Sequence, residues 1–295
     1  MDEARLQDFL QYLRFEKRFS AHTLSAYEND LRQFYVYIAT QFDALTLFEI
    51  NHFHLRSWLA SLKDEHQTAR TINRKLSSLS SFFKYLMKHG VLEKNPVKQL
   101  HSLRSEERLP QYLKENEAQN LLEELHFEEG FKGKTDRMIC ELLYQTGMRR
   151  NELLQLKEND IEWSLRQIRV MGKGGKERLI PMSALLLEDM QNYREEKKQI
   201  EPTAHHFLML ENGLPLYAGY IYRVVKKYLS QVTTLKKKSP HILRHSFATH
   251  LLNNGANIQA IKDLLGHSSL AATQVYTHNN IEKLKEIHKL NHPRA

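Results

Sequence analysis

The sequence predicts a mainly α-helical protein that carries a small antiparallel β-sheet and is divided into two domains. The chain has 295 residues, which is too long for one ordinary core and suits two domains of roughly 100–200 residues each. Its first hundred residues place apolar side chains at helical spacing. One later stretch, residues 161–181, instead has alternating and β-branched residues on both sides of a glycine-rich turn, which predicts a β-hairpin.

The helical domain is expected over residues 1–94. Apolar stripes predict helices near residues 6–13, 24–38, 52–62 and 68–89, the last of them ending at Gly90. The other face of the fourth helix carries cations separated by small hydroxyl residues, namely Arg70, Arg74, Ser77, Ser81 and Lys84. Such a face can approach a phosphate backbone closely. An ordinary solvated face explains the pattern equally well, so both interpretations stay open.

A linker is expected at residues 95–108, because two prolines and mixed charges break the helical pattern between residues 95 and 117. The second domain then covers residues 109–295. Besides the hairpin, it has a possible third strand at residues 205–210. Helices are expected near residues 218–232, 239–254 and 258–265, with Ser239 as N-cap, Pro240 at the first helical position, and Gly255 and Gly266 as C-terminal stops.

Charge and cysteine content indicate what kind of partner the protein binds and in which compartment it is expected. The formal net charge of +8 favours a polyanionic partner and salt-dependent binding. The only cysteine, Cys140, lies in an apolar run and is expected to be a buried thiol in a reducing compartment. No apolar run approaches the roughly 18 residues of a membrane span, and the amino terminus does not resemble a signal peptide. The chain is therefore expected in the cytoplasm, without membrane insertion.

Six polar side chains form a candidate site for chemistry at a phosphodiester. They are Arg149, Lys173, His241, Arg244, His267 and Tyr276. Arginine forks match phosphate oxygens bidentately, imidazole and lysine move protons, and a tyrosine hydroxyl can act as a covalent nucleophile. Taken singly, each residue also has an ordinary structural explanation, and most of the 13 tyrosines must serve packing or the surface.

Two of these residues are expected on one helix. His241 and Arg244 stand three apart behind Ser239-Pro240, so they share a face near a helix N-terminus, where backbone N–H groups favour an anion. Arg149 follows Gly147 at a junction between two helices, where Glu152 is expected either to orient it or to cap the next helix. Lys173 lies in the glycine-bracketed turn of the hairpin.

Metal and nucleotide binding are not expected. His241 and His245 stand four apart, but a zinc-protease helix needs a glutamate directly after the first histidine, and Ile242 occupies that position. The GKGG run at residues 172–175 lacks the remaining residues of a phosphate-binding loop. No cofactor is therefore predicted.

The ordered motifs resemble those of the tyrosine recombinases, also called the phage integrase family, and within it the Xer-type recombinases of bacteria. TGMRRNEL, GKGGKERLIP, HILRHSFATHLL, LGHSSLAATQVYTH and the terminal HPRA follow one another at familiar spacings. SAHTLSAYENDLRQF and TINRKLSSLSSFFKYL resemble the family's helical core-binding domain. The match covers nearly the whole chain. Its one noted difference, Met148 where leucine is usual, conserves volume.

The resemblance implies a helical-bundle core-binding (SAM-like) domain and a mixed α/β catalytic domain that clamp double-stranded DNA. Tyr276 would attack the scissile phosphate and form a 3′-phosphotyrosyl bond. Arg149, Arg244 and His267 would stabilise the phosphate, Lys173 would protonate the leaving 5′-oxygen, and His241 would assist proton transfer. The reaction would proceed through a Holliday junction and would need neither metal nor nucleotide.

The resemblance also implies partners. The protein would work on two DNA sites as a homo-tetramer, or as a hetero-tetramer with a paralogous recombinase, and an activating division protein is a further possible partner. A terminal helix at 281–290, with an apolar stripe of Leu284, Ile287 and Leu290, would dock on a neighbouring subunit. The family role expected for this chain is resolution of chromosome dimers at cell division.

Two other functions stay open. A mobile-element integrase would share the chemistry and differ in its target, although the short amino-terminal region, which lacks an added arm-binding domain, argues against the phage type. A non-catalytic, architectural DNA-binding protein is the second alternative, against which the complete set of six residues argues.

Overall fold

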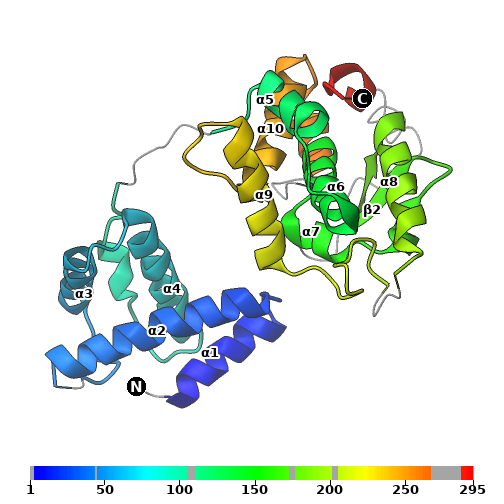
Figure 1. Ribbon diagram of the computed structural model, residues 1–295. Coiled ribbons are helices and arrows are strands. Elements are labelled where there is room, and N and C mark those ends of the chain that lie inside the picture. The colour runs from blue at the N-terminus through cyan, green and yellow to red at the C-terminus, as the bar shows by residue number, and fades with distance from the viewer. Residues whose placement is uncertain are drawn as a thin grey trace. The chain divides into compact units, whose positions relative to one another are not determined.

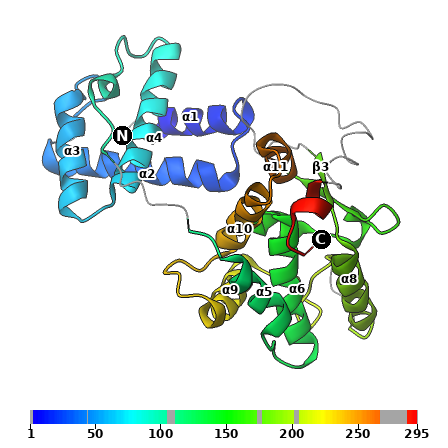
Figure 2. The same cartoon turned by 90° about the horizontal axis from the view of Figure 1, so that it is seen from above.

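The structure is a computed structural model that describes residues 3–43, 45–104, 111–172, 177–200, 205–266 and 287–294. The chain divides into two compact units, Met1–Arg108 and Leu109–Ala295, drawn as ribbons in Figures 1 and 2. Within the described ranges the chain is mainly helical and has one three-stranded antiparallel sheet, which confirms the predicted fold class. No helix in these ranges is long and apolar enough to cross a membrane.

The first unit is a four-helix domain in which α2 contacts each of the other three helices. Its elements are α1 (Glu3–Phe15), α2 (Ala21–Gln41), α3 (His52–Asp64), α4 (Ala69–Lys88) and a short 3-10 turn, η1 (Pro96–Gln99). The side chains of Ser20, Asn51 and Thr68 accept backbone N–H groups at the starts of α2, α3 and α4, which satisfies donors that a helix leaves open. The inward faces form one apolar core rich in aromatic rings.

Part of the expected linker belongs to this first unit. Val97 of η1 is buried in the core of the four helices, and the backbone of Leu103 exchanges two hydrogen bonds of 2.8 Å with the Asn73 side chain of α4. The chain is thus held on the unit through Leu103. Residues 105–108 of the expected linker lie outside the described residues.

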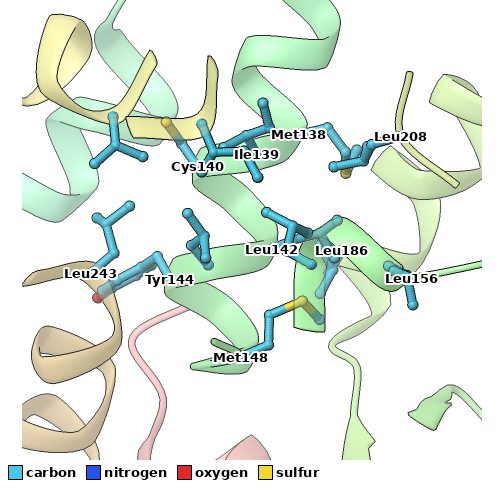
Figure 3. Close-up of a cluster of buried hydrophobic side chains, with 14 of the residues drawn as sticks. Met138, Ile139, Cys140, Leu142, Tyr144, Met148, Leu156, Leu186, Leu208 and Leu243 are labelled. Atoms are coloured by element: carbon cyan, nitrogen blue, oxygen red, sulfur yellow. The ribbon is translucent and has the colours of Figure 1, made fainter. Parts of the chain in front are cut away.

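The second unit is built around α6. Its helical elements are α5 (Glu115–Gln119), a π-type turn η2 (Asn120–Glu124), α6 (Gly130–Thr146), α7 (Arg150–Gln155), a 3-10 turn η3 (Glu158–Asp160), α8 (Ala184–Lys197), α9 (Ala218–Val232), α10 (Pro240–Asn253) and α11 (Ile258–Leu265). The core of this unit lies around α6, which contacts α7, α8, α9 and α10. Every residue from Met138 to Thr146 is buried, polar ones included, so neighbouring elements enclose this half of the helix on all sides. Figure 3 shows its side chains among those of neighbouring elements, including Leu186 of α8 and Leu243 of α10. Cys140 lies in this cluster as a buried free thiol, as predicted.

The sheet consists of β1 (Ile161–Glu162), β2 (Gln167–Met171) and β3 (Glu177–Pro181) in that order, all antiparallel. The predicted hairpin is β2–β3. The predicted third strand at 205–210 is wrong: this segment makes only isolated bridges, Lys157 with His206 and Met209 with Pro215, and β1 is the third strand. Phe207, Leu208 and Met209 are all buried in succession, whereas a strand of a sheet with one solvated face would alternate.

The described end of the chain, residues 287–294, packs on its own unit. The rings of His288 and His292 stack with centroids 4.9 Å apart, and His292 also lies against Phe247 of α10 and Tyr144 of α6. His288 Nε2 donates to the carbonyl of Gln145 at 2.9 Å. Burial lowers the pKa of both His288 and His292.

An ion pair holds the last residues in place. Arg294 donates to both carboxylate oxygens of the buried Glu141 at 2.9 and 3.0 Å. In the expected docking helix, Ile287 packs on the α10–α11 cluster, while Leu290 is 72% exposed and Leu284 lies outside the described residues. Docking on a neighbouring subunit therefore stays a prediction.

Candidate active site

Arg149 is positioned by a tight turn between α6 and α7. Gly147 adopts a left-handed conformation with φ of +60°, and a Cβ at that position would lie 2.4 Å from the ring of Phe247 in α10. Only glycine accepts both the conformation and the close approach. The turn therefore brings the start of α7 against α10. Arg149 is the residue before α7, and its guanidinium Nη2 donates to the carbonyl of Gly266 at 2.9 Å.

Arg244, which belongs to α10, contacts the same turn at the end of α11 as Arg149 does. Its side chain is buried, with 8% of the residue exposed, and its guanidinium donates to the carbonyls of Gly147 and Leu265. Arg244 thus contacts both the turn that ends α6 and the turn that ends α11, and Arg149 contacts the second of these turns. Gly266 caps α11 in a left-handed conformation, and the next residue along the chain is His267.

The electrostatics of this place favour an anion. Burial and the positive charges of Arg149 and Arg178 lower the pKa of Arg244 to about 9. A cation whose pKa is depressed by like charges gains interaction energy when a negative group binds nearby. Each guanidinium forms a planar fork suited to phosphate oxygens. The structure thus brings together two of the six predicted residues, from elements 95 positions apart in the chain.

His241 lies exposed near the start of α10, behind the buried N-cap residue Ser239. The helix begins at Pro240, as predicted, although the Ser239 side chain makes no capping hydrogen bond. Partial desolvation lowers the pKa of His241, and the positive charges of Lys237, Arg244, Arg150 and Arg149 lower it further. His241 is therefore electrostatically coupled to both arginines, and a neutral imidazole can accept a proton.

The other three predicted residues, Lys173, His267 and Tyr276, lie outside the described residues. For Lys173 and His267, the described residues next to them in the chain show which elements they adjoin. Lys173 stands in the sequence between β2, which ends at Met171, and β3, which begins at Glu177. His267 follows Gly266, whose carbonyl accepts from Arg149. Nothing in the described structure bears on Tyr276.

Glu152 both orients Arg149 and caps α7, the two roles that the sequence offered for it. Its carboxylate accepts from the backbone N–H of Arg149 at 2.7 Å, which caps α7, and from the Arg149 guanidinium at 2.8 Å, which orients the side chain. Burial raises the pKa of Glu152, but hydrogen bonds and charge from Arg178, together with hydrogen bonds from Arg149, outweigh that effect and place it below its usual range. The carboxylate is ionised and acts as an acceptor.

Arg178 is a site-supporting residue that the sequence analysis missed. It donates to both oxygens of Glu152 at 2.7 and 2.8 Å and through Nε to the carbonyl of Leu264 at 2.7 Å. A signal existed in the sequence. In a strand, residues two apart share a face, so Arg178 points the same way as Ile180, which is fully buried. An arginine on the inward face of a strand needs a buried partner.

The polar face of α4 is present as predicted, and part of it is already engaged within the first unit. Arg70, Arg74, Ser77 and Lys84 are exposed, and Ser81 is half-buried. Arg74 pairs with Asp30 of α2, a buried carboxylate that also accepts from Lys75 and Ser78. The hydroxyls of Ser77 and Ser81 donate to carbonyls one turn back in α4. Whether this face contacts DNA stays a prediction.

No cluster of three or more histidine, cysteine or carboxylate side chains suited to a metal ion occurs in the part of the chain that the structure describes. His241 and His245 do not form such a group with a third ligand there. Burial lowers the pKa of His245, and its ring lies against that of Tyr112.

This fold and site belong to a known class of DNA-processing protein. Residues 111–283 match the Phage integrase family, and residues 6–90 match the Phage integrase N-terminal SAM-like domain. The chain is a member of the phage integrase family, the tyrosine recombinases.

Curated relatives match along nearly the whole chain. A protein named Tyrosine recombinase XerC from Pelobacter propionicus is 37% identical over 99% of this chain and 96% of its own length. A protein of the same name from Staphylococcus haemolyticus is also 37% identical, over 97% of this chain and 96% of its own length.

Solved structures share the fold. The Tn1549 transposon integrase in complex with transposon right end DNA superposes with a TM-score of 0.72 at 22% identity, covering 96% of this chain and 98% of that one. The XerH site-specific recombinase bound to palindromic difH substrate has a TM-score of 0.71 at 23% identity, covering 95% of this chain and 82% of that one.

Proposed function

We propose that this tyrosine recombinase cuts and rejoins double-stranded DNA at a specific chromosomal site and resolves chromosome dimers at cell division. The observation that carries the proposal is the convergence of Arg149 and Arg244 on the turn that precedes His267. Two guanidinium forks at one point suit a phosphate whose negative charge increases during transfer. The XerC name of relatives that match almost end to end supports the chromosomal role.

The proposed chemistry assigns one role to each residue. The Tyr276 hydroxyl oxygen forms a bond to the scissile phosphorus while the bond to the 5′-oxygen breaks. Lys173 gives the proton that the leaving 5′-oxygen takes up, and His241 receives the proton from the tyrosine. Arg149, Arg244 and His267 stabilise the charge on the non-bridging oxygens. The freed 5′-hydroxyl then attacks the phosphorus of the 3′-phosphotyrosyl bond on the partner duplex. This step reverses cleavage: a new phosphodiester forms, the bond to the tyrosine oxygen breaks, and the tyrosine is regenerated.

The chromosomal role is tested by recovering, across the genome, the DNA covalently attached to the protein after rapid denaturation of growing cells. We expect the adducts to concentrate at one chromosomal site outside mobile elements. Adducts at the ends of a mobile element would instead identify an integrase with the same chemistry. If no covalent adducts form while the protein still occupies DNA, the protein is architectural and the enzymatic proposal fails.

We propose that four subunits, identical or drawn from this protein and a paralogous recombinase, assemble on two DNA sites, with the terminal helix of each contacting a neighbour. Support comes from Leu290, which stays 72% exposed beside the cis-packed His288 and His292. Ile287 of the same stripe packs within its own unit, so Leu290 is the described position of the stripe that a neighbouring subunit could contact.

Leu290→Ser is therefore expected to leave the melting temperature and half-site binding unchanged, because the side chain is exposed in the single chain. Pairing of two bound sites should weaken about tenfold, equivalent to ~1.4 kcal/mol. Leu185→Ser, an exposed leucine of α8, is the matched control. Gel-shift titration and single-molecule synapsis assays would measure both. Normal synapsis by the Leu290 variant would remove the terminal helix from the proposed interface.

A further inference from the structure

Arg178 joins three elements that converge at the candidate site. The residue itself belongs to β3. Its two Nη atoms bind Glu152 in α7 at 2.7 and 2.8 Å, and its Nε binds the Leu264 carbonyl in the last turn of α11 at 2.7 Å. Each of the three guanidinium nitrogens therefore donates a hydrogen bond within the protein. The side chain is 3% exposed, so it cannot itself contact DNA.

The link to Arg149 is direct. Glu152 uses one oxygen to accept both the Arg149 and the Arg178 guanidinium, and the other to accept both the Arg149 backbone N–H and Arg178. A carboxylate with one arginine partner could rotate with it. Because Arg178 also binds both oxygens of Glu152, rotation of the carboxylate would break these bonds, and this restrains the Arg149 guanidinium as well.

The link to the turn before His267 is equally direct. A Cβ on Gly266 would lie 3.0 Å from Cδ of Arg178, so the arginine stem packs on this glycine. The Gly266 carbonyl accepts from Arg149 and the Leu265 carbonyl accepts from Arg244. The Arg178 side chain thus contacts the turn whose carbonyls accept hydrogen bonds from both arginines, and its charge helps to lower the pKa of Arg244.

We propose that Arg178 is a positioning residue for strand cleavage, which sets the guanidinium of Arg149 through Glu152 and sets the Leu264–Gly266 turn that both site arginines contact. This inference rests on the proposed function. Lysine cannot replace Arg178, because an ammonium group lacks the planar fork that binds two carboxylate oxygens while a third N–H reaches a carbonyl.

The test uses Arg178→Lys in the full chain, with Arg169→Lys as matched control. Arg169 belongs to the neighbouring strand β2 and pairs with Glu162 and Glu177 at the surface. We measure the melting temperature, half-site binding, and single-turnover formation of the covalent adduct on nicked DNA. Arg178→Lys should bind DNA normally and form adduct about 10²-fold more slowly, the order expected for a misplacement of ~1 Å. Arg169→Lys should match the unmodified protein.

Two further readouts separate positioning from a general loss of structure. A substrate with a 5′-bridging sulfur at the scissile bond needs no proton for departure. It should restore Lys173→Ala but not Arg178→Lys, because the defect of the latter lies in the arginines. In addition, the double variant Arg149→Lys/Arg178→Lys should lose less than the product of the two single losses, since both changes weaken the shared contact with Glu152.

The outcomes are distinct. Normal cleavage by Arg178→Lys, full rescue of that variant by the sulfur substrate, or additive losses in the double variant would each overturn the inference. If Arg178→Lys is too unstable to assay, Glu152→Gln replaces it, because it keeps an acceptor for the α7 cap while weakening both arginine contacts, and the same three results are decisive. Absence of adduct with the unmodified protein would instead refute the proposed function.

Discussion

Tyr276→Phe is expected to abolish covalent attachment to DNA while leaving DNA binding nearly unchanged. The substitution removes only the hydroxyl oxygen that would form the bond to phosphorus, and binding rests on many phosphate contacts elsewhere. A duplex nicked near the cleavage point traps the adduct, because the short released strand diffuses away. A denaturing gel then reports the adduct directly.

The control is another tyrosine to phenylalanine change in the same unit. Tyr222 of α9 is exposed, and Tyr222→Phe should cleave like the unmodified protein. A persistent adduct in the Tyr276 variant would transfer the role of nucleophile to another residue. Loss of DNA binding in that variant would show that the hydroxyl also serves an earlier step.

Arg244→Lys is expected to lower the rate of cleavage by at least ~10²-fold, the order seen when one donor to a developing oxyanion is lost. The charge remains, but the fork that reaches two backbone carbonyls and a phosphate together does not. Arg149→Lys should behave alike, since its guanidinium contacts Gly266 and Glu152. Affinity for DNA should change much less than the cleavage rate.

Single-turnover cleavage at saturating protein separates these two quantities. Arg194→Lys is the control, because Arg194 pairs with Glu158 and lies over the ring of Trp163 in the same unit. A near-normal cleavage rate in either site variant would limit that arginine to holding the turns that it contacts. A drop in affinity equal to the drop in rate would assign it to ground-state DNA binding.

The sequence by itself determined the four helices of the first unit, the hairpin and the helices α9, α10 and α11, and it predicted the chemical groups of the site. Helical spacing predicted α2, α3 and α4 closely, and the predicted helix at 218–232 coincides with α9. These features are local, because periodicity, caps and glycine stops act within a few residues. The ordered motifs likewise predicted the chemical groups, because residue identity is read directly from the sequence, whereas the pKa of a group such as Arg244 depends on the fold.

Predictions from local sequence patterns were wrong where a segment is buried by residues that lie far away in the sequence. Residues 205–210 have strand-like composition, yet Phe207 and Leu208 join the core cluster of the second unit, and Met209 is buried beside them, in an irregular segment. The first unit extends past residue 94 for a similar reason. Val97 packs in the apolar core formed by the four earlier helices, and the Asn73 side chain forms two hydrogen bonds with the backbone of Leu103.

Only the tertiary structure decided which residues act together. Arg149 and Arg244 meet because Gly147 lets α6 turn against Phe247 of α10, a contact between residues 100 positions apart. Arg178 joined the site only through its partners Glu152 and Leu264, which no spacing rule links to it. A buried charge must find its counter-charge in three dimensions. The residues that orient the site's functional groups are therefore selected by packing between distant segments.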